Sequence, residues 1–284
     1  MRESISVFGS SGFIGDRFCD LYPEETIRIS REDRATKSKN ILYLISTIDN
    51  YNVFTDPFID IKTNLTLLIE TLEECKDSED VVFNFVSSWF VYGKTNSFPA
   101  TEESTCDPKG FYSITKRAAE QLLISYCETF GIKYRIFRLC NIYGETDKKV
   151  SKKRNALQFL IGELAEDRDI NLYDNGENIR DFMYVDDVCR AIRLCTQEGP
   201  YNEVINIGSG QPHRFKDIMK YAKEKLDSKA RLVPIEPPEF HKVAQVKDMY
   251  LDTTKLKNLG FVEKFGIEKG LDIIIENIKE IKNE

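Results

Sequence analysis

Short apolar runs alternate with longer segments of helical periodicity over the first half of the chain. The apolar runs predict strands at residues 5–8, 26–29, 41–46, 81–86 and 134–139. Apolar side chains at three- and four-residue spacing predict amphipathic helices at residues 14–21, 60–75 and 112–130. Strands that alternate with helices favour a parallel sheet that is covered on both faces. The pattern therefore predicts an α/β fold with a Rossmann-type doubly wound parallel sheet.

The alternation loosens after about residue 150. Residues 148–154 are basic and polar, which predicts a loop, and three prolines between residues 234 and 238 predict another. Residues 204–207 predict a further strand. The Lys- and Glu-rich segment 267–284 predicts a solvated amphipathic helix.

The length of 284 residues fits one large domain, or one domain with a small lobe. We expect a dinucleotide-binding Rossmann domain over residues 1–150, with a return near residues 181–210. The remainder, mainly residues 151–284, is expected to form a smaller C-terminal substrate-binding lobe. That lobe would cover the carboxyl edge of the sheet, where open α/β sheets bind ligands.

Composition excludes some classes of protein. A hydrophobic content of 41% and a net charge of −7 indicate a globular protein with no sign of nucleic-acid binding, although a local basic cluster can still bind an anionic substrate. No apolar run approaches a membrane span, and the chain enters a strand without a signal peptide. Seven scattered cysteines without a C-x-x-C pair favour reduced thiols in the cytoplasm. The two histidines, His213 and His241, lack metal-ligand spacing, so no metal is expected.

A glycine-rich turn follows the first predicted strand, and it reads Gly9-Ser10-Ser11-Gly12-Phe13-Ile14-Gly15. A strand, glycine turn and helix place backbone N–H groups and a helix N-terminus against phosphate oxygens. The spacing is G-x-x-G-x-x-G, which differs from the common G-x-G-x-x-G fingerprint. The turn therefore predicts a dinucleotide site, with a purely structural glycine loop as the alternative.

Tyr112 and Lys116 are four residues apart, so they share one face of a helix. A nearby ammonium group favours the phenolate form of a tyrosine, whose ordinary pKa is about 10. Such a tyrosine can take a proton from a sugar hydroxyl or give one to a developing alkoxide. Ser87 and Ser88, at the end of a predicted strand, are placed to add a hydroxyl donor.

The spacing alone is weak evidence, because Tyr221 and Lys225 repeat it. They lie in residues 215–226, which read as an ordinary amphipathic helix, and no Ser-Ser pair after a strand leads into it. We interpret the second pair as having no catalytic role.

Several motifs in order make the chain resemble the extended short-chain dehydrogenase/reductase superfamily, specifically its nucleotide-sugar epimerase/dehydratase branch. The matching segments are the glycine turn, Thr63-Asn64-Leu65, Ser87 to Gly93, Tyr112 with Lys116, Arg138 to Gly144, Arg180 to Val188, and Asn206 to Gly210. The resemblance spans nearly the whole chain.

This resemblance implies roles for particular residues. It implies a catalytic role for Ser88, Tyr112 and Lys116. It implies cofactor contacts from Gly9, Ser11, Gly12, Phe13, Ile14, Gly15, Ser30, Arg31, Tyr112 and Lys116. It implies substrate contacts from Ser88, Trp89, Asn141, Asn155 and Arg180, of which Asn141 and Arg180 would touch a diphosphate. The competing interpretation of Arg180 is a salt bridge to Asp181 or Asp186.

The residues after the catalytic hydroxyl narrow the reaction. Dehydratases of this branch usually carry an acid and a base at these positions, and decarboxylases usually carry a glutamate there. This chain has Trp89 and Phe90 instead. Neither aromatic side chain exchanges protons, so reductase and epimerase chemistry remain. The aromatic pair either shapes a sugar pocket or packs in the local core.

The end of the second predicted strand bears on the cofactor. NAD-selective enzymes usually place an acid there, whereas Ser30 followed by Arg31 suits a 2′-phosphate, with Arg34 as an assistant. We therefore predict NADP, with NAD as the alternative, and a solvated loop arginine as the competing interpretation of Arg31. Only about a dozen residues separate this strand from the next, where the family usually fits another strand and helix, so the adenine side is expected to be rebuilt or more open.

The main hypothesis is an NADP-dependent reductase of a nucleoside-diphosphate 4-keto-6-deoxy sugar, acting at C4 in surface-polysaccharide synthesis. The alternative is a 4-epimerase with tightly bound NAD, and the third hypothesis is a non-catalytic NADP-binding protein. The resemblance also implies a homodimer that pairs helices 60–75 and 112–130. In Val246 to Asp252 the chain lacks an arginine that many relatives place before the aspartate, and Lys247 is the candidate replacement.

Overall fold

The computed structural model describes residues 4–48, 50–95, 97–147, 150–151, 155–244 and 246–283. Most of the loop predicted at 148–154, and the last residue of the helix predicted at 267–284, lie outside these ranges. Within the described residues, no helix is both long and apolar enough to cross a membrane.

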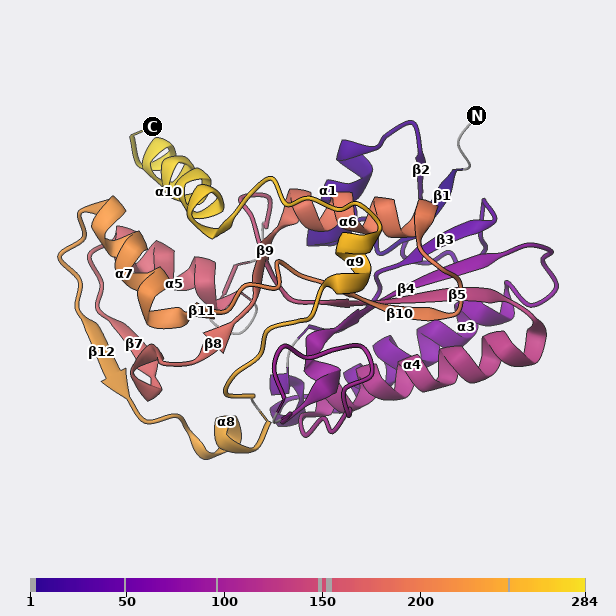
Figure 1. The fold of residues 1–284 in the computed structure, drawn as a ribbon, viewed down its shortest axis with the longest axis horizontal. Helices are drawn as coiled ribbons and strands as arrows, with labels where there is room; N and C mark the ends of the chain where they lie inside the picture. The colour runs from indigo at the N-terminus through magenta and orange to yellow at the C-terminus, as the bar shows by residue number, and fades with distance from the viewer. Residues whose placement is uncertain are drawn as a thin grey trace.

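A parallel sheet forms the centre of the molecule (Figure 1). In spatial order its strands are β10 (Glu203–Ile207), β5 (Lys133–Leu139), β4 (Val82–Ser88), β3 (Asn40–Tyr43), β1 (Ile5–Phe8) and β2 (Thr26–Arg28). Every neighbouring pair in this order is parallel. The predicted α/β fold with a doubly wound sheet is confirmed.

Helices cover both faces of this sheet (Figure 1). One face carries α1 (Phe13–Leu21) and α6 (Val185–Glu198), and the other carries α3 (Leu67–Glu73) and α4 (Phe111–Phe130). Successive side chains of a strand point to opposite faces, so Val7 and Phe8 of β1 enter different buried clusters. Both faces of β1 are therefore buried, as is typical of the inner strands of a parallel sheet.

One helix and one strand differ from the sequence prediction. The helix expected at residues 60–75 begins at Phe58 and comprises α2 (Phe58–Ile61), a π-helical turn η2 (Lys62–Thr66) and α3. The predicted third strand at 41–46 ends at Tyr43, so Ser46 and Thr47 lie in the following loop. There they hydrogen-bond to Asn64 of η2, and this side-chain pairing replaces the strand pairing that a longer β3 would make.

The segment between β2 and β3 has no helix among its described residues, which run from 29 to 39 without a gap. The chain passes from β2, at the edge of the sheet, back across β1 to β3. The strand order therefore reverses at β1, whose carboxyl end carries the glycine turn. Such a reversal leaves a crevice where open α/β sheets bind ligands.

A group of short strands and helices extends beyond the carboxyl ends of the sheet (Figure 1). Its strand pairs are β6 (Asn141–Tyr143) with β9 (Phe182–Tyr184), β7 (Ile170–Tyr173) with β12 (Leu232–Ile235), and β8 (Ile179–Arg180) with β11 (His213–Arg214). Its helices are α5 (Ala156–Ala165), α7 (Phe215–Leu226) and α10 (Ile267–Asn283), which contact one another. The remaining elements are η1 (Asn50–Phe54), η3 (Trp89–Tyr92), η4 (Asp174–Gly176), α8 (Glu239–Ala244) and α9 (Thr254–Asn258).

Candidate active site

A cleft of about 900 Å³ joins the carboxyl end of the central sheet to the smaller group of elements. From the sheet side it is lined by the end of β4 and the start of α4, and from the other side by β7, η4 and β8. The described residues that line it include Ile14, Ser88, Trp89, Tyr112, Lys116, Asn141, Asn155 and Arg180. Folding thus brings all the predicted catalytic and substrate residues and Ile14 to one cavity, whereas the rest of the glycine turn, Ser30 and Arg31 are not among its described lining residues.

The glycine turn has the backbone geometry of a phosphate-binding loop. Gly9 has a φ of +80°, and a Cβ on Gly15 would lie 2.3 Å from the Gly9 carbonyl oxygen. Gly12 caps α1 and donates its N–H to the same oxygen at 3.0 Å. These residues fit a dinucleotide, because a side chain is excluded where the backbone packs closely and the N-terminus of α1 is available to an anion. Ser11 is exposed and Phe13 packs against the core.

The end of β2 presents Ser30 and Arg31 to solvent. Arg34 is held elsewhere, since it pairs with Glu70 at 3.2 Å and donates to the Arg31 carbonyl at 2.9 Å. The sequence interpretation overlooked Arg28, whose guanidinium donates to the Ser10 carbonyl at 2.8 Å. Arg28 also pairs with two carboxylates of α1, so it braces the glycine turn. Arg31 is therefore the arginine of this segment that is open to a 2′-phosphate.

The two adjacent serines at the end of β4 have different surroundings. Ser87 donates to the buried Glu120 carboxylate at 2.6 Å. The half-buried Ser88 hydroxyl accepts the Phe90 N–H at 3.3 Å and caps η3. A hydroxyl that accepts a backbone N–H keeps its own proton to donate. Both serines line the cleft, but the Ser87 hydroxyl donates to Glu120, whereas the Ser88 proton is left for a ligand.

Lys116 lies one helical turn beyond Tyr112 and is 1% exposed. Its ammonium group donates to the Val86 carbonyl at 2.7 Å and lies 4.1 Å from the centre of the Phe85 ring. Burial lowers the pKa of Lys116 to about 7, against the opposing effect of Glu120. A lysine with such a pKa is in keeping with a catalytic site.

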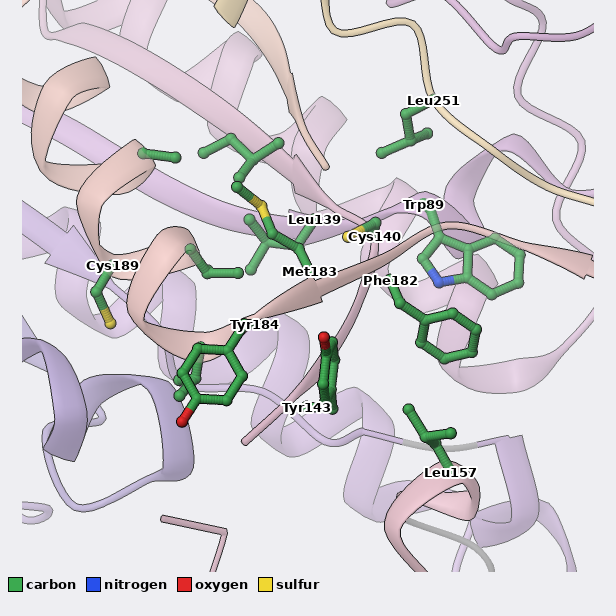
Figure 2. Close-up of a cluster of buried hydrophobic side chains, with 14 of the residues drawn as sticks. Trp89, Leu139, Cys140, Tyr143, Leu157, Phe182, Met183, Tyr184, Cys189 and Leu251 are labelled. Carbon is green, nitrogen blue, oxygen red and sulfur yellow. The ribbon is translucent and has the colours of Figure 1, made fainter. Parts of the chain in front are cut away.

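Trp89 and Phe90 pack in or against the core and also line the cleft, while a role in shaping a sugar pocket stays a prediction. Their rings stack at 4.1 Å, and the edge of Phe90 meets Tyr112 at 5.9 Å. Trp89 is 3% exposed, and Figure 2 shows it beside Phe182 in a cluster of buried side chains. Both aromatic residues also line the cleft. They are core residues with one face on the cavity.

Arg180 forms no ion pair with Asp181 or Asp186 in the described structure. Asp181 accepts N–H groups of residues 209, 210 and 251, and Asp186 pairs with Arg17 at 2.5 Å. The Arg180 guanidinium donates to the backbone carbonyls of Val246 and Lys247 and lies 5.5 Å from the centre of the Trp89 ring. Burial lowers the pKa of Arg180 to about 10, and an anionic ligand would relieve that desolvation.

The two asparagines differ. Asn141 donates to the Asp181 carbonyl at 2.9 Å at the rim of the cleft. Asn155 is the N-cap of α5: its side-chain oxygen accepts the Gln158 N–H at 3.3 Å, and its amide donates to the Gln158 side chain. The structure therefore shows a capping role for Asn155, while its contact with a nucleotide base stays a prediction.

Charge in the cleft is opposite to that of the whole chain. Its basic lining residues are Lys94, Lys116, Arg180, Lys242 and Lys247, and its acidic lining residues within the described chain are Asp174 and Asp248. An excess of cations favours an anionic ligand despite the net charge of −7.

The sequence interpretation missed an aromatic cluster at the side of the cleft. The His241 ring on α8 meets Tyr173 of β7 at 4.7 Å, and its ring nitrogen is hydrogen-bonded to the Tyr51 hydroxyl of η1. Phe240 packs on Tyr51 and Phe54 of η1. The partners in each of these contacts are about 70 to 190 positions apart in the chain, so no local sequence pattern predicts the cluster.

Comparisons with known proteins agree with this geometry. A sequence model of the NAD dependent epimerase/dehydratase family matches residues 41–208. A UDP-glucuronate 4-epimerase of Thermodesulfobacterium geofontis is 28% identical over 235 residues, covering 80% of this chain and 70% of that protein. Two solved structures share the fold. The UDP-glucose 4-epimerase of Thermotoga maritima with UDP-glucose has a TM-score of 0.87 at 24% identity, covering 98% and 99% of the two chains. RMD from Pseudomonas aeruginosa complexed with NADPH has a TM-score of 0.86 at 20% identity, with the same coverage.

The family match runs from β3 to just beyond β10, which is more than half of the chain. It includes the end of β4, the Tyr112–Lys116 turn of α4, and Arg180. The family resemblance predicted from the motifs is confirmed. The chain belongs to the NAD dependent epimerase/dehydratase family.

Proposed function

We propose that this protein is an NADP-dependent oxidoreductase that reduces a nucleoside-diphosphate 4-keto-6-deoxy sugar at C4, for surface-polysaccharide synthesis. The observation that carries the proposal is the convergence of Ser88, Tyr112 and Lys116 at one wall of a cation-lined cleft. NADPH, when bound, supplies the hydride.

Each residue has a defined task in this reaction. Tyr112 gives a proton to the oxygen at C4, and the Ser88 hydroxyl donates a hydrogen bond to that oxygen. Lys116 lowers the pKa of Tyr112 and holds the cofactor ribose. Arg180 and Asn141 bind the substrate diphosphate, for which a guanidinium is well suited. Gly9, Gly12 and Gly15, with Ser11, Phe13 and Ile14, hold the cofactor pyrophosphate.

The lining of the cleft favours hydride transfer without elimination. An elimination needs an acid and a base beside the reacting carbon, and the positions after Ser88 hold stacked aromatic rings. The acidic residues of the described lining, Asp174 and Asp248, come from the smaller lobe, and Asp248 accepts the Ile179 N–H at 2.8 Å.

The cofactor segment favours a reductase over an epimerase. The connection from β2 to β3 lacks a helix, and Ser30 and Arg31 are exposed, so the adenosine end of a dinucleotide meets few protein groups. A cofactor held by few groups dissociates readily. A reductase must exchange its cofactor in every turnover, whereas an epimerase regenerates it in place.

The test is the balance of cofactor against product. Purified protein is incubated with a nucleoside-diphosphate 4-keto-6-deoxy sugar and NADPH, and absorbance at 340 nm is followed together with the sugar product. We expect one NADPH to be consumed for each deoxy sugar formed, and Arg31→Ala to raise KM for NADPH about tenfold while leaving NADH unaffected.

The alternative, a 4-epimerase with tightly bound NAD, rests on the same catalytic residues. It predicts interconversion of nucleoside-diphosphate hexoses without added cofactor and no net consumption of NADPH. That result would replace the reductase assignment.

We also propose which part of the chain binds each ligand. Residues 1–150 bind the dinucleotide, and the chain returns to this part near residues 181–210. The segment 151–284 mainly binds the sugar nucleotide.

We further propose that the protein is a homodimer. Exposed apolar side chains on α2 and α4, such as Phe58 at 77% and Ile114 at 47%, support a dimer through these helices. Light scattering should give twice the chain mass, and a monomeric wild type would contradict the dimer. Ile114→Glu should give the mass of one chain.

A further inference from the structure

Glu120 is a fully buried carboxylate in the part of α4 that packs against β4, the strand that ends at Ser88. It lies one helical turn after Lys116, so both side chains leave the same face of the helix. Its oxygens accept hydrogen bonds from Ser87 at 2.6 Å, Arg117 at 2.7 Å, and Arg138 at 2.8 and 3.0 Å. A buried charge with this many donors is satisfied, and its position is fixed.

The same two helix residues hold successive residues of β4. Lys116 donates to the Val86 carbonyl at 2.7 Å, and Glu120 accepts the Ser87 hydroxyl. Ser88 comes next and reaches the cleft. The distance between the Ser88 hydroxyl and the Tyr112 turn of α4 is therefore set by two contacts that lie one helical turn apart.

Glu120 also acts on Lys116 through its charge. Burial disfavours the ammonium form of Lys116, and Glu120 is the carboxylate that opposes this effect. Burial would raise the pKa of Glu120 itself, but hydrogen bonds and charge from Arg138, with Ser87 and Arg117, hold its pKa below the ordinary value. Glu120 is therefore ionised at neutral pH, where the protonation of Lys116 is in balance.

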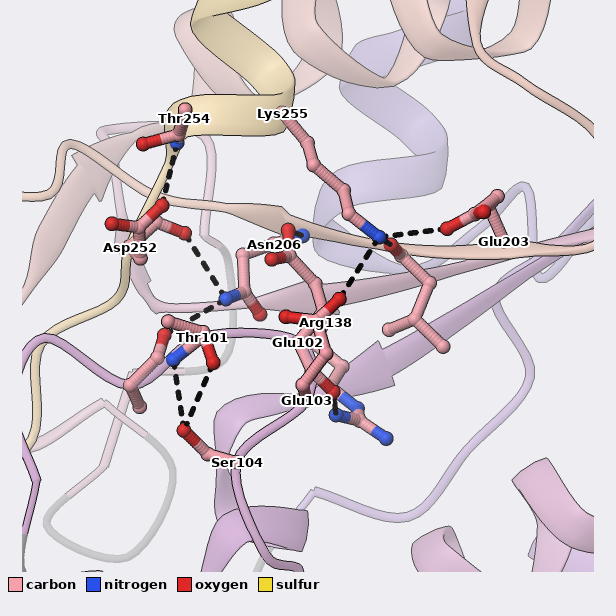
Figure 3. A network of polar contacts seen from close by, with 12 residues as sticks. Thr101, Glu102, Glu103, Ser104, Arg138, Glu203, Asn206, Asp252, Thr254 and Lys255 are labelled. Carbon is pink, nitrogen blue, oxygen red and sulfur yellow. Dashed lines mark hydrogen bonds and ion pairs between the residues drawn. The ribbon is translucent and has the colours of Figure 1, made fainter.

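Other charged and titratable groups face this pair, and they belong to several elements. They are Arg117 of α4, Arg138 of β5, Tyr92 of η3 and Cys106 of the loop before α4, and Glu102 of the same loop acts on Tyr92. Figure 3 shows Arg138 donating to the Glu102 backbone at 3.1 Å, beside a polar network that continues to Lys255. Arg138 lies within the segment that resembles a sugar-nucleotide motif, but its guanidinium binds Glu120 and so helps to hold the site in place.

We propose that Glu120 is a positioning residue that fixes the end of β4 against the catalytic helix and holds a buried negative charge one helical turn from Lys116. This inference rests on the proposed function for its effect on rate, but its effect on Lys116 is independent of the reaction. It assigns a role to a residue that touches neither substrate nor cofactor.

The test replaces the charge and keeps the shape. Glu120→Gln is compared with Glu224→Gln, which makes the same change on the exposed face of α7. The titration of the Lys116 side chain is followed by NMR of 13C-labelled lysine, without substrate. We expect the midpoint to fall by about one pH unit in Glu120→Gln and to stay in place in Glu224→Gln. The fall of kcat with rising pH should move by the same amount, with KM changed less than about twofold.

A second variant guards against misfolding. Glu120→Gln leaves Arg138 without its carboxylate, so Glu120→Gln with Arg138→Met removes both charges. In the folded double variant both charges are gone, so the Lys116 midpoint should return part of the way toward the wild-type value. A midpoint at or below that of folded Glu120→Gln would show that the charges at residues 120 and 138 do not act on Lys116, and the inference would be wrong.

The two proposals fail in different ways. An unchanged Lys116 midpoint in folded Glu120→Gln contradicts the inference, even if the wild type reduces its substrate. A lowered midpoint in a protein without reductase activity supports the electrostatic role of Glu120 and contradicts the proposed function.

Discussion

Tyr112–Lys116 and Tyr221–Lys225 have the same residue types at the same spacing, each on a well-formed helix. The first pair is 7% and 1% exposed and lines the cleft. In the second pair, the Tyr221 hydroxyl donates to Asp272 of α10 at 2.9 Å, and the Lys225 ammonium group lies 3.1 Å from the same carboxylate. The second pair therefore ties α7 to α10 and has no contact with the site.

The difference between the pairs lies in solvation. Burial lowers the pKa of Lys116 to about 7, whereas hydrogen bonds to Tyr221 and Asp272 raise the pKa of the half-exposed Lys225. Lys116 is buried beside Tyr112 at the cleft, whereas the ammonium group of Lys225 is paired with Asp272 at the surface. The spacing supplies the geometry of a proton-transfer pair, and the surroundings supply the chemistry.

The largest expected effect is the loss of turnover in Tyr112→Phe. Removal of the proton donor should lower kcat by about 10²–10⁴-fold, measured as NADPH consumption with a 4-keto sugar nucleotide. Tyr221→Phe is the matched control and should keep kcat within about twofold. Equal, measurable rates for Tyr112→Phe and the wild type would contradict the proposed role of Tyr112 as proton donor.

The next effect concerns the replacement of Lys116, which is expected to lower activity and to raise stability. Lys116→Met should inactivate the enzyme but raise the free energy of unfolding at pH 7 by about 1–2 kcal/mol, because a desolvated ammonium group is removed. Denaturant unfolding measures this change, and Lys225→Met, which loses an ion pair on the surface, should be slightly less stable than the wild type.

The pH dependence sharpens the same contrast. The pKa of Lys116 is about 7 in the folded protein, against about 10.5 in the unfolded chain. Between these two pH values the unfolded chain binds one proton more at this residue than the folded protein does. The contribution of Lys116 to the free energy of unfolding therefore rises with pH over this range. Lys225 has a raised pKa, so its contribution is present below its unfolded pKa and is lost only as pH rises through the folded value. The wild type should therefore gain stability relative to Lys116→Met from pH 7 to 9.5. A flat difference would show that Lys116 is not desolvated.

Local pattern located the strands of the sheet to within a few residues, because most of them are apolar runs buried on both faces, although β2 at the edge has no buried residue. β1 was predicted with its observed bounds. The sequence analysis missed α6, although Val185, Val188 and Cys189 show the helical spacing that marked the other helices. It also extended β3 past Tyr43, since apolar residues continue there while the pairing ends.

At the site, motif order located the residues but left several of their partners undecided. The Ser-Ser pair marked the end of β4, and only the Glu120 carboxylate distinguishes Ser87 from Ser88. Arg180 was ambiguous in sequence because two aspartates are near it in the chain, and the structure pairs those aspartates with other groups. The capping role of Asn155 depends on where α5 begins.

The sequence by itself determined the fold class and the family, because apolar periodicity and a glycine turn are local properties that short stretches of chain encode. Tertiary structure decided which of two identical Tyr-x-x-x-Lys spacings is buried beside a cleft, since desolvation and charge depend on residues far apart in the chain. It also decided that Glu120, which no motif singled out, supports the pair that the motif did identify.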